Sequence, residues 1–450
     1  MHVHFIGVAG VTMAPLAVLY KKMGWKVTGS DRAFFPPMST YLEQNGITVM
    51  PGYKEEHLNP KPDLCVVMAF ITKKNPELKF AIQHKIPYKA YAEVLPQLIE
   101  GKNAIVVAGS KGKTSTTALV TWILEVAGHN PNFMIGGIAK NFPDGIRKTD
   151  SSWSVMEGDE YPVANWKKTA KFLEYHPRFL ILTGITWDHM DIYPTKKSYR
   201  EIFRKLVAKM PKEGAIIANA EGEYLKELLK NTTKKVLWYN EDRELHFTPP
   251  FKGKAWRENS QAAAVLAKAI GISNPIIRKA LDTFQGVKRR QEVRYDEKGI
   301  VIIDDNAHSP EKVEGVLETL QEQYPQRKIL AVYEPGSRNT KALNQKSYAT
   351  CFAKTDYILL PRVSAARETI AHFNERLWKK FSGNYQHMEY IPSDVELIRR
   401  ITKIAAHWRQ SKQKGVIAFM SQKGFRGMIE ETISLLRSGA TPTNHPALLP

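Results

Sequence analysis

Cysteine is scarce in this chain of 450 residues, and long apolar runs are absent. The two cysteines, Cys65 and Cys351, stand far apart, so a disulfide-stapled secreted framework is excluded and a reducing compartment, the cytoplasm, is expected. No segment approaches the roughly 18 uninterrupted apolar residues of a membrane span. The first residues, MHVHFIGVAG, lack the basic-then-apolar layout of a signal peptide and indicate a strand that enters the fold.

Zinc motifs are missing as well. The chain contains no HxxxH or CxxC pair, which argues against a zinc site. Hydrophobic residues make up 43% and charged residues 24% of the chain, so intrinsic disorder and collagen are excluded as descriptions of the whole.

Positive charge, in contrast, is abundant. The 65 lysine and arginine residues outnumber the 45 acidic residues and give a net charge of +20. One interpretation is binding to nucleic acid or to a membrane surface, and the other is an enzyme with a strongly anionic substrate. Because the basic residues are spread along the chain and no nucleic-acid module is recognised, we expect a solvated basic surface without a dedicated nucleic-acid site.

Strand-like and helix-like segments alternate along the whole chain, which predicts an α/β fold. The strand HVHFIGV and a helix from Met13 to Lys22 open the first unit. The pattern restarts near Gly101 with AIVVAGS and a helix from Thr114 to Ala127, and again after GVKRR with KGIVIIDDNAH. We therefore predict three consecutive α/β domains, with boundaries at 1–98, 99–287 and 288–450.

The strongest local signal is AIVVAGSKGKTSTTALV, where a buried strand runs into a tight turn and a helix. Backbone N–H groups of such a turn and the positive end of the helix bind polyphosphate. Lys113 would reach the β- and γ-phosphates, and the Thr114 hydroxyl would ligate Mg²⁺. We predict an ATP site here, although Val107 stands where the common phosphate loop has its first glycine and a generic strand–turn–helix is the alternative. The site comprises Gly109, Ser110, Lys111, Gly112, Lys113, Thr114 and Ser115.

A weaker glycine turn, with Gly7 and Gly10, follows the first strand and precedes the first helix. With Asp31 at the end of the next strand, this geometry would hold a nucleotide diphosphate at the helix N-terminus and a ribose hydroxyl on the carboxylate. The alternatives are a turn without a ligand and a dehydrogenase, but a dehydrogenase does not explain the second phosphate loop.

Carboxylates and histidines follow three predicted strands at the point where each ends. They are Glu157, Asp159 and Glu160, then Asp188 and His189, then Asp304, Asp305 and His308. In an open α/β sheet these strand ends face the ligand crevice, and carboxylates there would hold Mg²⁺. A solvated loop is the alternative for each cluster alone. Arg289 and Arg290, at the last predicted boundary, could clamp a phosphate, and the alternative is that they are ordinary basic residues of the surface.

The ordered set of motifs resembles the Mur ligase family of ATP-dependent amide-bond ligases. The motifs are FIGVAGVTM with GSD, GSKGKTSTT, EGDEY, TWDHMDIY, GVKRR, DDNAHSP and FMSQKGF, and they cover nearly the whole chain. The resemblance implies a Rossmann-like UDP-binding domain, a phosphate-loop ATPase domain and a C-terminal Rossmann-like domain. It also implies that a UDP-N-acetylmuramate carboxylate is phosphorylated by ATP, with Mg²⁺, and that an amine then attacks the acyl phosphate.

Roles for individual residues follow from the same resemblance. Lys113 would bind the phosphates, and Thr114, Glu157 and His189 would surround the magnesium. Arg290 and Asp305 would complete the nucleotide site, with His308 as a nearby substrate contact, and Asn259 is one candidate for the adenine, beside Glu258 and Gln261. The UDP moiety would be bound by Gly7, Gly10, Ser30 and Asp31.

The identity of the amine stays open. The stretch from VMEGDEY to TWDHMDIY resembles the ligases that accept a ready-made tripeptide, L-Ala-γ-D-Glu-diaminopimelate, in peptidoglycan recycling more than those that accept L-alanine. However, Gly336 stands where tripeptide ligases tend to have an arginine, and Arg338, Arg362 or Arg367 could replace it. A non-catalytic nucleotide-binding relative is a third hypothesis, but joint retention of Lys113, Thr114, Glu157, His189 and Asp305 favours an enzyme, and we expect a monomer.

Overall fold

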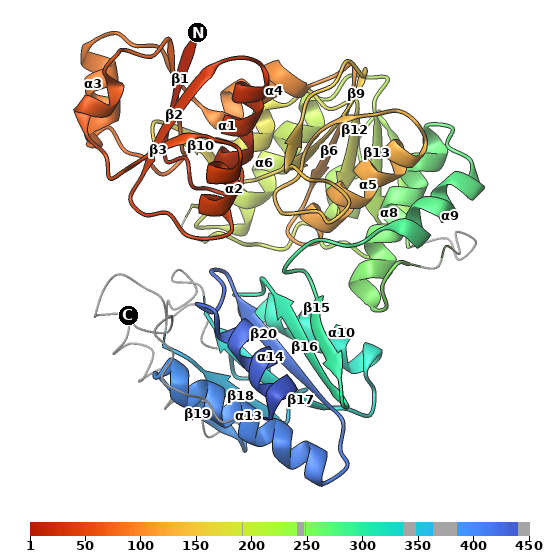
Figure 1. Ribbon diagram of the computed structural model, residues 1–450. Helices are drawn as coiled ribbons and strands as arrows, with labels where there is room; N and C mark the ends of the chain where they lie inside the picture. Colours follow the sequence, from red (N-terminus) through yellow and green to blue (C-terminus); the bar gives the residue numbers. More distant parts are fainter. Residues whose placement is uncertain (191, 241–246, 248, 336–347, 363–384, 440–450) are drawn as a thin grey trace. The chain divides into compact units, whose positions relative to one another are not determined.

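The computed structural model describes residues 1–190, 192–240, 247, 249–335, 348–362 and 385–439 (Figure 1). The chain divides into two compact units. The first comprises Met1–Pro250 and Trp256–Val287, and the second comprises Phe251–Ala255 and Lys288–Pro450. Two large sheets and a two-stranded ribbon belong to the first unit, and one large sheet belongs to the second.

The first sheet has five parallel strands in the order β3-β2-β1-β4-β5. The strands are β1 (His2–Ile6), β2 (Lys26–Asp31), β3 (Thr48–Pro51), β4 (Leu64–Val67) and β5 (Tyr88–Ala90). The helices are α1 (Met13–Lys22), α2 (Met38–Gln44), α3 (Pro76–Gln83) and α4 (Tyr91–Ile99). The strand order reverses between β1 and β4, and the carboxyl ends of strands at such a reversal flank a ligand crevice.

The second sheet has seven strands in the order β14-β13-β12-β6-β9-β7-β8, all parallel except β8. They are β6 (Asn103–Ala108), β7 (Asn132–Met134), β8 (Ile146–Arg147), β9 (Trp153–Gly158), β12 (Phe179–Leu182), β13 (Ala215–Asn219) and β14 (Lys235–Tyr239). The ribbon pairs β10 (Pro162–Ala164) with β11 (Lys167–Ala170). The helices are α5 (Lys113–Val126), α6 (Lys196–Lys209), α7 (Leu225–Leu229), α8 (Lys254–Ala269) and α9 (Asn274–Thr283).

One apolar core runs through both sheets of the first unit. It includes Leu16 of α1 and Val94 of α4 together with Met134 of β7 and Leu180 of β12. Polar contacts reinforce the junction, because Asp144 accepts hydrogen bonds from both Lys22 and Tyr41. The expected boundary near residue 98 lies inside this unit, in the last turn of α4, and stays a prediction.

The sheet of the second unit has six strands in the order β15-β16-β20-β17-β18-β19. They are β15 (Glu292–Glu297), β16 (Ile300–Asp305), β17 (Lys328–Glu334), β18 (Tyr357–Leu360), β19 (Met388–Tyr390) and β20 (Gly415–Ser421), and only β15 is antiparallel to its neighbour. The helices α10 (Pro310–Gln323), α13 (Asp394–Gln410) and α14 (Met428–Ser438) belong to this unit. Side chains of β16, β17 and β20 contribute to two apolar cores.

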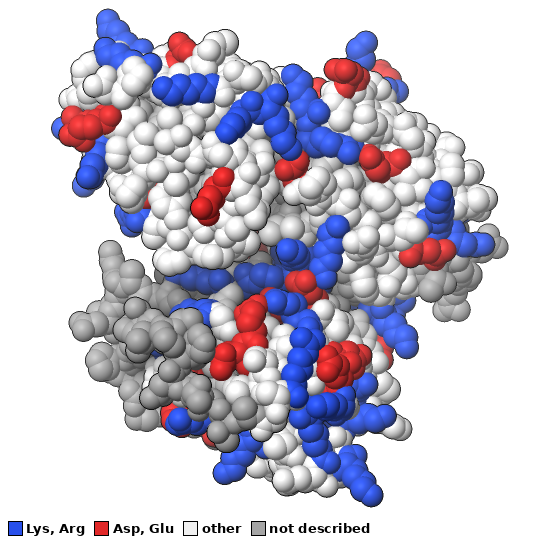
Figure 2. Space-filling view, in the orientation of Figure 1, with Lys and Arg blue, Asp and Glu red and all other residues white. Residues whose placement is uncertain are grey.

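The α/β alternation expected from the sequence is confirmed. The helix expected from Met13 to Lys22 is found at those residues, and the one expected from Thr114 to Ala127 is found one residue earlier. In the part of the chain that the structure describes, no helix is long and apolar enough to cross a membrane. Lysine and arginine side chains are scattered over the visible faces of both units, with acidic residues among them (Figure 2). Both cysteines are buried and free.

Candidate active site

The turn between β6 and α5 has the backbone conformation that the phosphate-loop motif predicts. Gly109 and Gly112 adopt positive φ angles of 137° and 77°. A Cβ atom on Gly109 would lie 2.2 Å from the hydroxyl of Thr183, and one on Gly112 would lie 2.6 Å from the side-chain oxygen of Asn259. Glycine is therefore required at both positions by conformation and by space.

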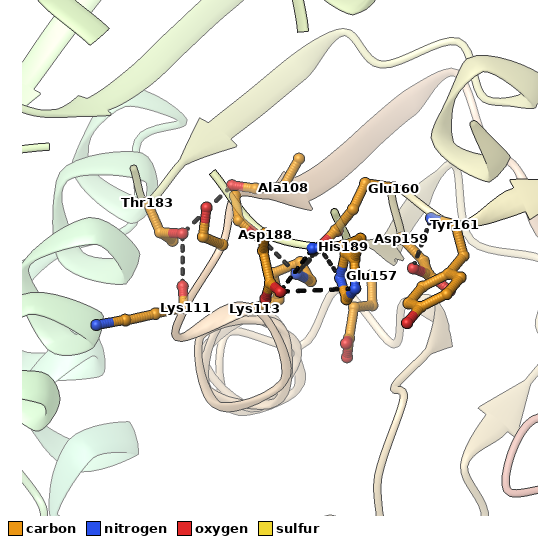
Figure 3. A network of polar contacts seen from close by, with 12 residues as sticks. Ala108, Lys111, Lys113, Glu157, Asp159, Glu160, Tyr161, Thr183, Asp188 and His189 are labelled. Carbon is orange, nitrogen blue, oxygen red and sulfur yellow. Dashed lines mark hydrogen bonds and ion pairs between the residues drawn. The ribbon is translucent and has the colours of Figure 1, made fainter. Parts of the chain in front are cut away.

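The segment that follows β12 holds this turn in place. The Thr183 hydroxyl donates to the carbonyl of Lys111 at 2.6 Å, and the Ser110 hydroxyl donates to the carbonyl of Thr186 at 2.6 Å. Lys111 itself points its side chain away from the polar network (Figure 3). Ser110 is therefore placed by the structure as a tether of the loop, and Thr183 is a supporting residue that the sequence did not identify.

The centre of the site is a buried carboxylate that contacts a lysine and a histidine (Figure 3). Glu160, only 1% exposed at its side chain, lies 2.9 Å from the Lys113 ammonium and accepts a hydrogen bond of 3.0 Å from Nε2 of His189. Lys113 also donates to the carbonyl of Gly109 at 2.5 Å. The lysine of the phosphate loop is thus folded back over the loop toward Glu160.

Mutual electrostatics dominate this cluster. Burial by itself lowers the pKa of Lys113, but the neighbouring Glu160 carboxylate outweighs it and raises the pKa. Burial likewise raises the pKa of Glu160, but the positive charge of Lys113 and the hydrogen bond from His189 lower it overall. The pair is therefore held in its charged form inside the protein.

The expected magnesium ligands form two groups. The Thr114 hydroxyl donates to Oε1 of Glu157 at 3.0 Å, and the other oxygen of Glu157 accepts from the backbone N–H of Gly136 at 2.9 Å. His189 instead bonds Glu160. Within the described ranges, no group of three or more His, Cys, Asp and Glu side chains is arranged to hold a metal ion. Thr114 and Glu157 supply the hard oxygen donors that Mg²⁺ prefers.

His189 is held in an uncommon conformation by its neighbours. Its φ angle is +55°, and the carboxylate of Asp188 accepts its backbone N–H at 2.7 Å. The Tyr161 ring packs against the histidine ring, with 4.2 Å between the centroids. Strained backbone of this kind concentrates at functional sites, which agrees with the role predicted for His189.

A second ion pair, formed by a buried lysine and a partly exposed carboxylate, supports the loop after β9. Lys171 lies 2.6 Å from Asp159, and its ammonium sits 5.1 Å from the ring centroid of Tyr91 and 5.7 Å from that of Tyr161. Burial lowers the pKa of Lys171, but the Asp159 carboxylate raises it overall. Asp159 is therefore the ion-pair partner of Lys171, and Lys171 is a further residue that the motifs did not identify.

Asn259 contacts the phosphate loop from α8. It is 7% exposed, and its side-chain oxygen accepts a hydrogen bond of 3.0 Å from Thr116, in the first turns of α5. The same oxygen lies against Gly112. Its expected contact with the adenine stays a prediction, and the structure adds a role in bracing the loop.

The first glycine turn is tied to the end of β2. The N–H groups of Gly7 and Val8 both donate to the Ser30 carbonyl, and that of Ala9 donates to the Asp31 carboxylate at 2.9 Å. Gly7 adopts a φ of 90°, whereas Gly10 does not have a positive φ. Asp31 thus lies beside the turn, as the motif predicts.

Ser30 differs from its neighbours because its hydroxyl points inward. The side chain is fully buried and donates to Glu77 at 2.5 Å, and His57 contacts the other oxygen of Glu77 at 2.7 Å. A direct contact of the Ser30 hydroxyl with UDP would require this buried bond to break. The predicted contact of Ser30 with UDP stays a prediction, and the structure adds that its backbone carbonyl holds the turn through Gly7 and Val8.

In the second unit, Asp305 anchors the segment after β16. Its carboxylate accepts the N–H groups of Gln291 and Ala307, each at 2.7 Å. Burial raises its pKa, although the positive charge of Arg290 and these hydrogen bonds oppose the rise. His308 contacts the Asn306 carbonyl at 2.7 Å. The roles expected for Arg290, Asp305 and His308 stay predictions.

The arginines considered for the amine substrate are only partly described. Arg362 lies 3.2 Å from Asp394, whereas Gly336, Arg338 and Arg367 lie outside the described residues.

Comparison with known proteins decides the family. Three successive models match: the Mur ligase family catalytic domain at residues 2–103, the Mur ligase middle domain at 107–262 and the Mur ligase glutamate ligase domain at 289–420. A UDP-N-acetylmuramate–L-alanyl-γ-D-glutamyl-meso-2,6-diaminoheptandioate ligase of Haemophilus influenzae is 32% identical, over 80% of this chain and 85% of that protein. The chain belongs to the Mur ligase family.

Other Mur ligases are also similar. A UDP-N-acetylmuramate–L-alanine ligase of Agathobacter rectalis is 28% identical, over 82% of this chain and 84% of that protein. The crystal structure of a murein peptide ligase from Psychrobacter arcticus matches with a TM-score of 0.73 at 27% identity, over 97% of this chain and 98% of that one. The expected three-part α/β fold and the expected class, an ATP-dependent amide-bond ligase, are confirmed for this Mur ligase.

Proposed function

We propose that this Mur ligase joins UDP-N-acetylmuramate to the free amine of L-alanyl-γ-D-glutamyl-meso-diaminopimelate, at the expense of ATP, in the recycling of peptidoglycan. The observation that carries the proposal is the similarity to the Haemophilus ligase, which is 32% identical over most of both chains and acts on that tripeptide by name. The buried cluster of Lys113, Glu160 and His189 beside the phosphate loop supports it. The reaction takes place in the cytoplasm, where ATP is available.

The chemistry has two steps. A carboxylate oxygen of UDP-N-acetylmuramate attacks the γ-phosphorus of ATP, and ADP leaves with the electrons of the broken P–O bond. The amine nitrogen of the tripeptide then attacks the acyl carbon, inorganic phosphate leaves, and the nitrogen loses a proton. Such phosphoryl transfer depends mainly on positioning and on neutralising charge, which is work for fixed cations and N–H groups.

The residues around the phosphate loop fit ATP and Mg²⁺. Strand β6, the glycine turn and the N-terminus of α5 follow one another directly, and the positive end of a helix in this arrangement favours a polyphosphate. Lys113 supplies a mobile positive charge for the phosphates once it leaves Glu160. Thr114 and Glu157 would hold the magnesium, which neutralises phosphate charge when bound. The share of His189 in this site stays a proposal.

A UDP-N-acetylmuramate–L-alanine ligase is the second candidate. Several such ligases align along the chain, and the one from Agathobacter rectalis is 28% identical. The two candidates share the UDP-sugar and ATP and differ only in the amine.

A competition experiment separates them. Radiolabelled UDP-N-acetylmuramate, ATP and Mg²⁺ are incubated with the full chain and equal concentrations of the tripeptide and L-alanine, and the products are resolved by chromatography. We expect the tripeptide product to dominate. A higher kcat/KM for L-alanine would identify an alanine-adding ligase, and the absence of phosphate release with either amine would contradict both candidates.

A further inference from the structure

The segment that follows β4 brings a half-exposed aromatic ring to the crevice of the first sheet. Phe70 comes three residues after the end of β4 and is 53% exposed. Met68 in the same segment contacts the first glycine turn, since a Cβ on Gly7 would lie 2.7 Å from the Met68 Cβ. This is the point where the strand order reverses between β1 and β4, so the ring stands beside the expected UDP site.

Toward the second sheet, contacts continue from Phe70 to the phosphate loop. The Phe70 ring packs edge-to-face on Tyr161, with centroids 6.0 Å apart and planes at 84°. Tyr161 packs on His189, which bonds Glu160, the partner of Lys113. All these residues belong to the first unit. The segment with Met68 and Phe70 therefore contacts the first glycine turn on one side and, through Tyr161, the residues around Lys113 on the other.

Tyr161, on which the Phe70 ring packs, is held by further contacts. The backbone N–H of Tyr161 donates to Asp159 at 3.0 Å, and the Lys171 ammonium lies 5.7 Å from the Tyr161 ring. Lys171 and Asp159 are joined at 2.6 Å. A ring supported in this way can contact a ligand without first losing much side-chain freedom.

We propose that Phe70 is a specificity-determining residue whose exposed ring packs against the sugar ring of the UDP-sugar. The inference rests on the proposed function, in which one substrate carries a diphosphate to the first glycine turn and a carboxylate to the phosphate loop. The sugar of that substrate lies between these two groups in its covalent structure, and one face of a pyranose presents C–H groups. Such a face suits an aromatic surface, whose burial is favourable.

The test compares two ligands that differ by the sugar. Binding of UDP and of UDP-N-acetylmuramate to the full chain is measured by calorimetry for the wild type, Phe70→Ala, Phe70→Tyr and Ile82→Ala. Phe70→Ala is expected to raise the Kd for UDP-N-acetylmuramate by roughly 10- to 30-fold, because about half a ring of apolar contact is lost. The Kd for UDP should stay within about twofold of the wild-type value. Phe70→Tyr should bind both ligands like the wild type. Ile82→Ala is the matched control, since Ile82 is an apolar residue 39% exposed on α3.

Each outcome decides the inference. If Phe70→Ala weakens the binding of UDP and of UDP-N-acetylmuramate equally, the proposed sugar contact is overturned, because the ring would then act through the glycine turn. Unchanged binding of both ligands would also overturn it, as would failure of the wild type to bind UDP-N-acetylmuramate. If the wild type binds the UDP-sugar and Phe70→Ala weakens it selectively, but no amine is ligated, the proposed function fails while the sugar contact stands.

Discussion

The ammonium of Lys113 lies 2.9 Å from the carboxylate of Glu160, and the two side chains are 15% and 1% exposed. The lysine that the phosphate-loop motif assigns to the nucleotide is therefore paired with a carboxylate of the protein. In the proposed mechanism, the phosphate oxygens of ATP replace the Glu160 carboxylate as the partner of Lys113. His189 also contacts the Glu160 carboxylate, and this contact does not involve Lys113.

Lys113→Ala is expected to abolish ligation. In the proposed mechanism the ammonium neutralises charge on the transferring phosphoryl group, and the loss of such an electrostatic contact typically costs about 2.7–4 kcal/mol in the barrier, or roughly 100- to 1000-fold in kcat. The rate of ligation is measured as phosphate release from ATP in the presence of both substrates. Near-normal turnover by a folded variant would remove Lys113 from the catalytic role.

A double variant separates this loss of activity from a loss of stability. Lys113→Ala leaves the Glu160 carboxylate buried without its lysine, which should cost roughly 3–5 kcal/mol of stability. Adding Glu160→Gln removes the buried charge, so the midpoint of thermal unfolding should recover while ligation stays lost. A double variant no more stable than Lys113→Ala would show that the unpaired Glu160 carboxylate is not what destabilises the single variant.

Glu157→Gln should act through magnesium. The carboxylate accepts the Thr114 hydroxyl and the Gly136 N–H, and an amide is a poorer ligand for a hard cation. We expect the Mg²⁺ concentration for half-maximal activity to rise by roughly tenfold or more, as the loss of one charged ligand implies. Asp188→Asn serves as a comparison at the other strand end. An unchanged Mg²⁺ titration for Glu157→Gln would assign that residue a structural role.

Asn259→Ala should weaken the use of ATP by loosening the phosphate loop. The variant removes the acceptor of the Thr116 hydroxyl, and one such hydrogen bond is worth about 0.5–1.5 kcal/mol, so KM for ATP should rise by roughly 2- to 12-fold. Thr116→Val removes the same bond from the other side and should reproduce the effect. If only Asn259→Ala raises KM, the amide contacts the nucleotide directly, as the adenine hypothesis states.

Glu77 should make the first sheet sensitive to acid. Burial raises the pKa of this carboxyl, but the His4 ring 3.6 Å away and the contacts with Ser30 and His57 lower it overall. A carboxyl whose pKa is lowered by folding stabilises the folded protein at every pH above its pKa in the unfolded chain, which is about 4.3. This stabilisation is lost as the pH falls through the pKa that the carboxyl has in the folded protein. The gap in thermal midpoint between wild type and Glu77→Gln should therefore narrow below about pH 4.3. A gap that stays constant between pH 7 and pH 3 would contradict this account.

The local parts of the fold followed from the sequence. The phosphate loop was located because a strand, a glycine turn and a helix are contiguous, and the positive φ angles of Gly109 and Gly112 are a local requirement of that geometry. The clusters after β9 and β12 were located because polar residues directly follow apolar strands. The antiparallel β15 was missed, since Glu292–Glu297 is mostly polar and pairs as an edge strand.

The partners of the site residues were decided by tertiary structure. Glu160 meets Lys113 across 47 residues, Asn259 meets Thr116 across 143, and Ser30 turns toward Glu77 across 47. The sequence determined which chemical groups stand at the strand ends, because alternation of strands and helices and turn chemistry act over a few residues. Which carboxylate neutralises which cation depends on the order of the strands in each sheet and on burial, and these arise only when distant segments pack together.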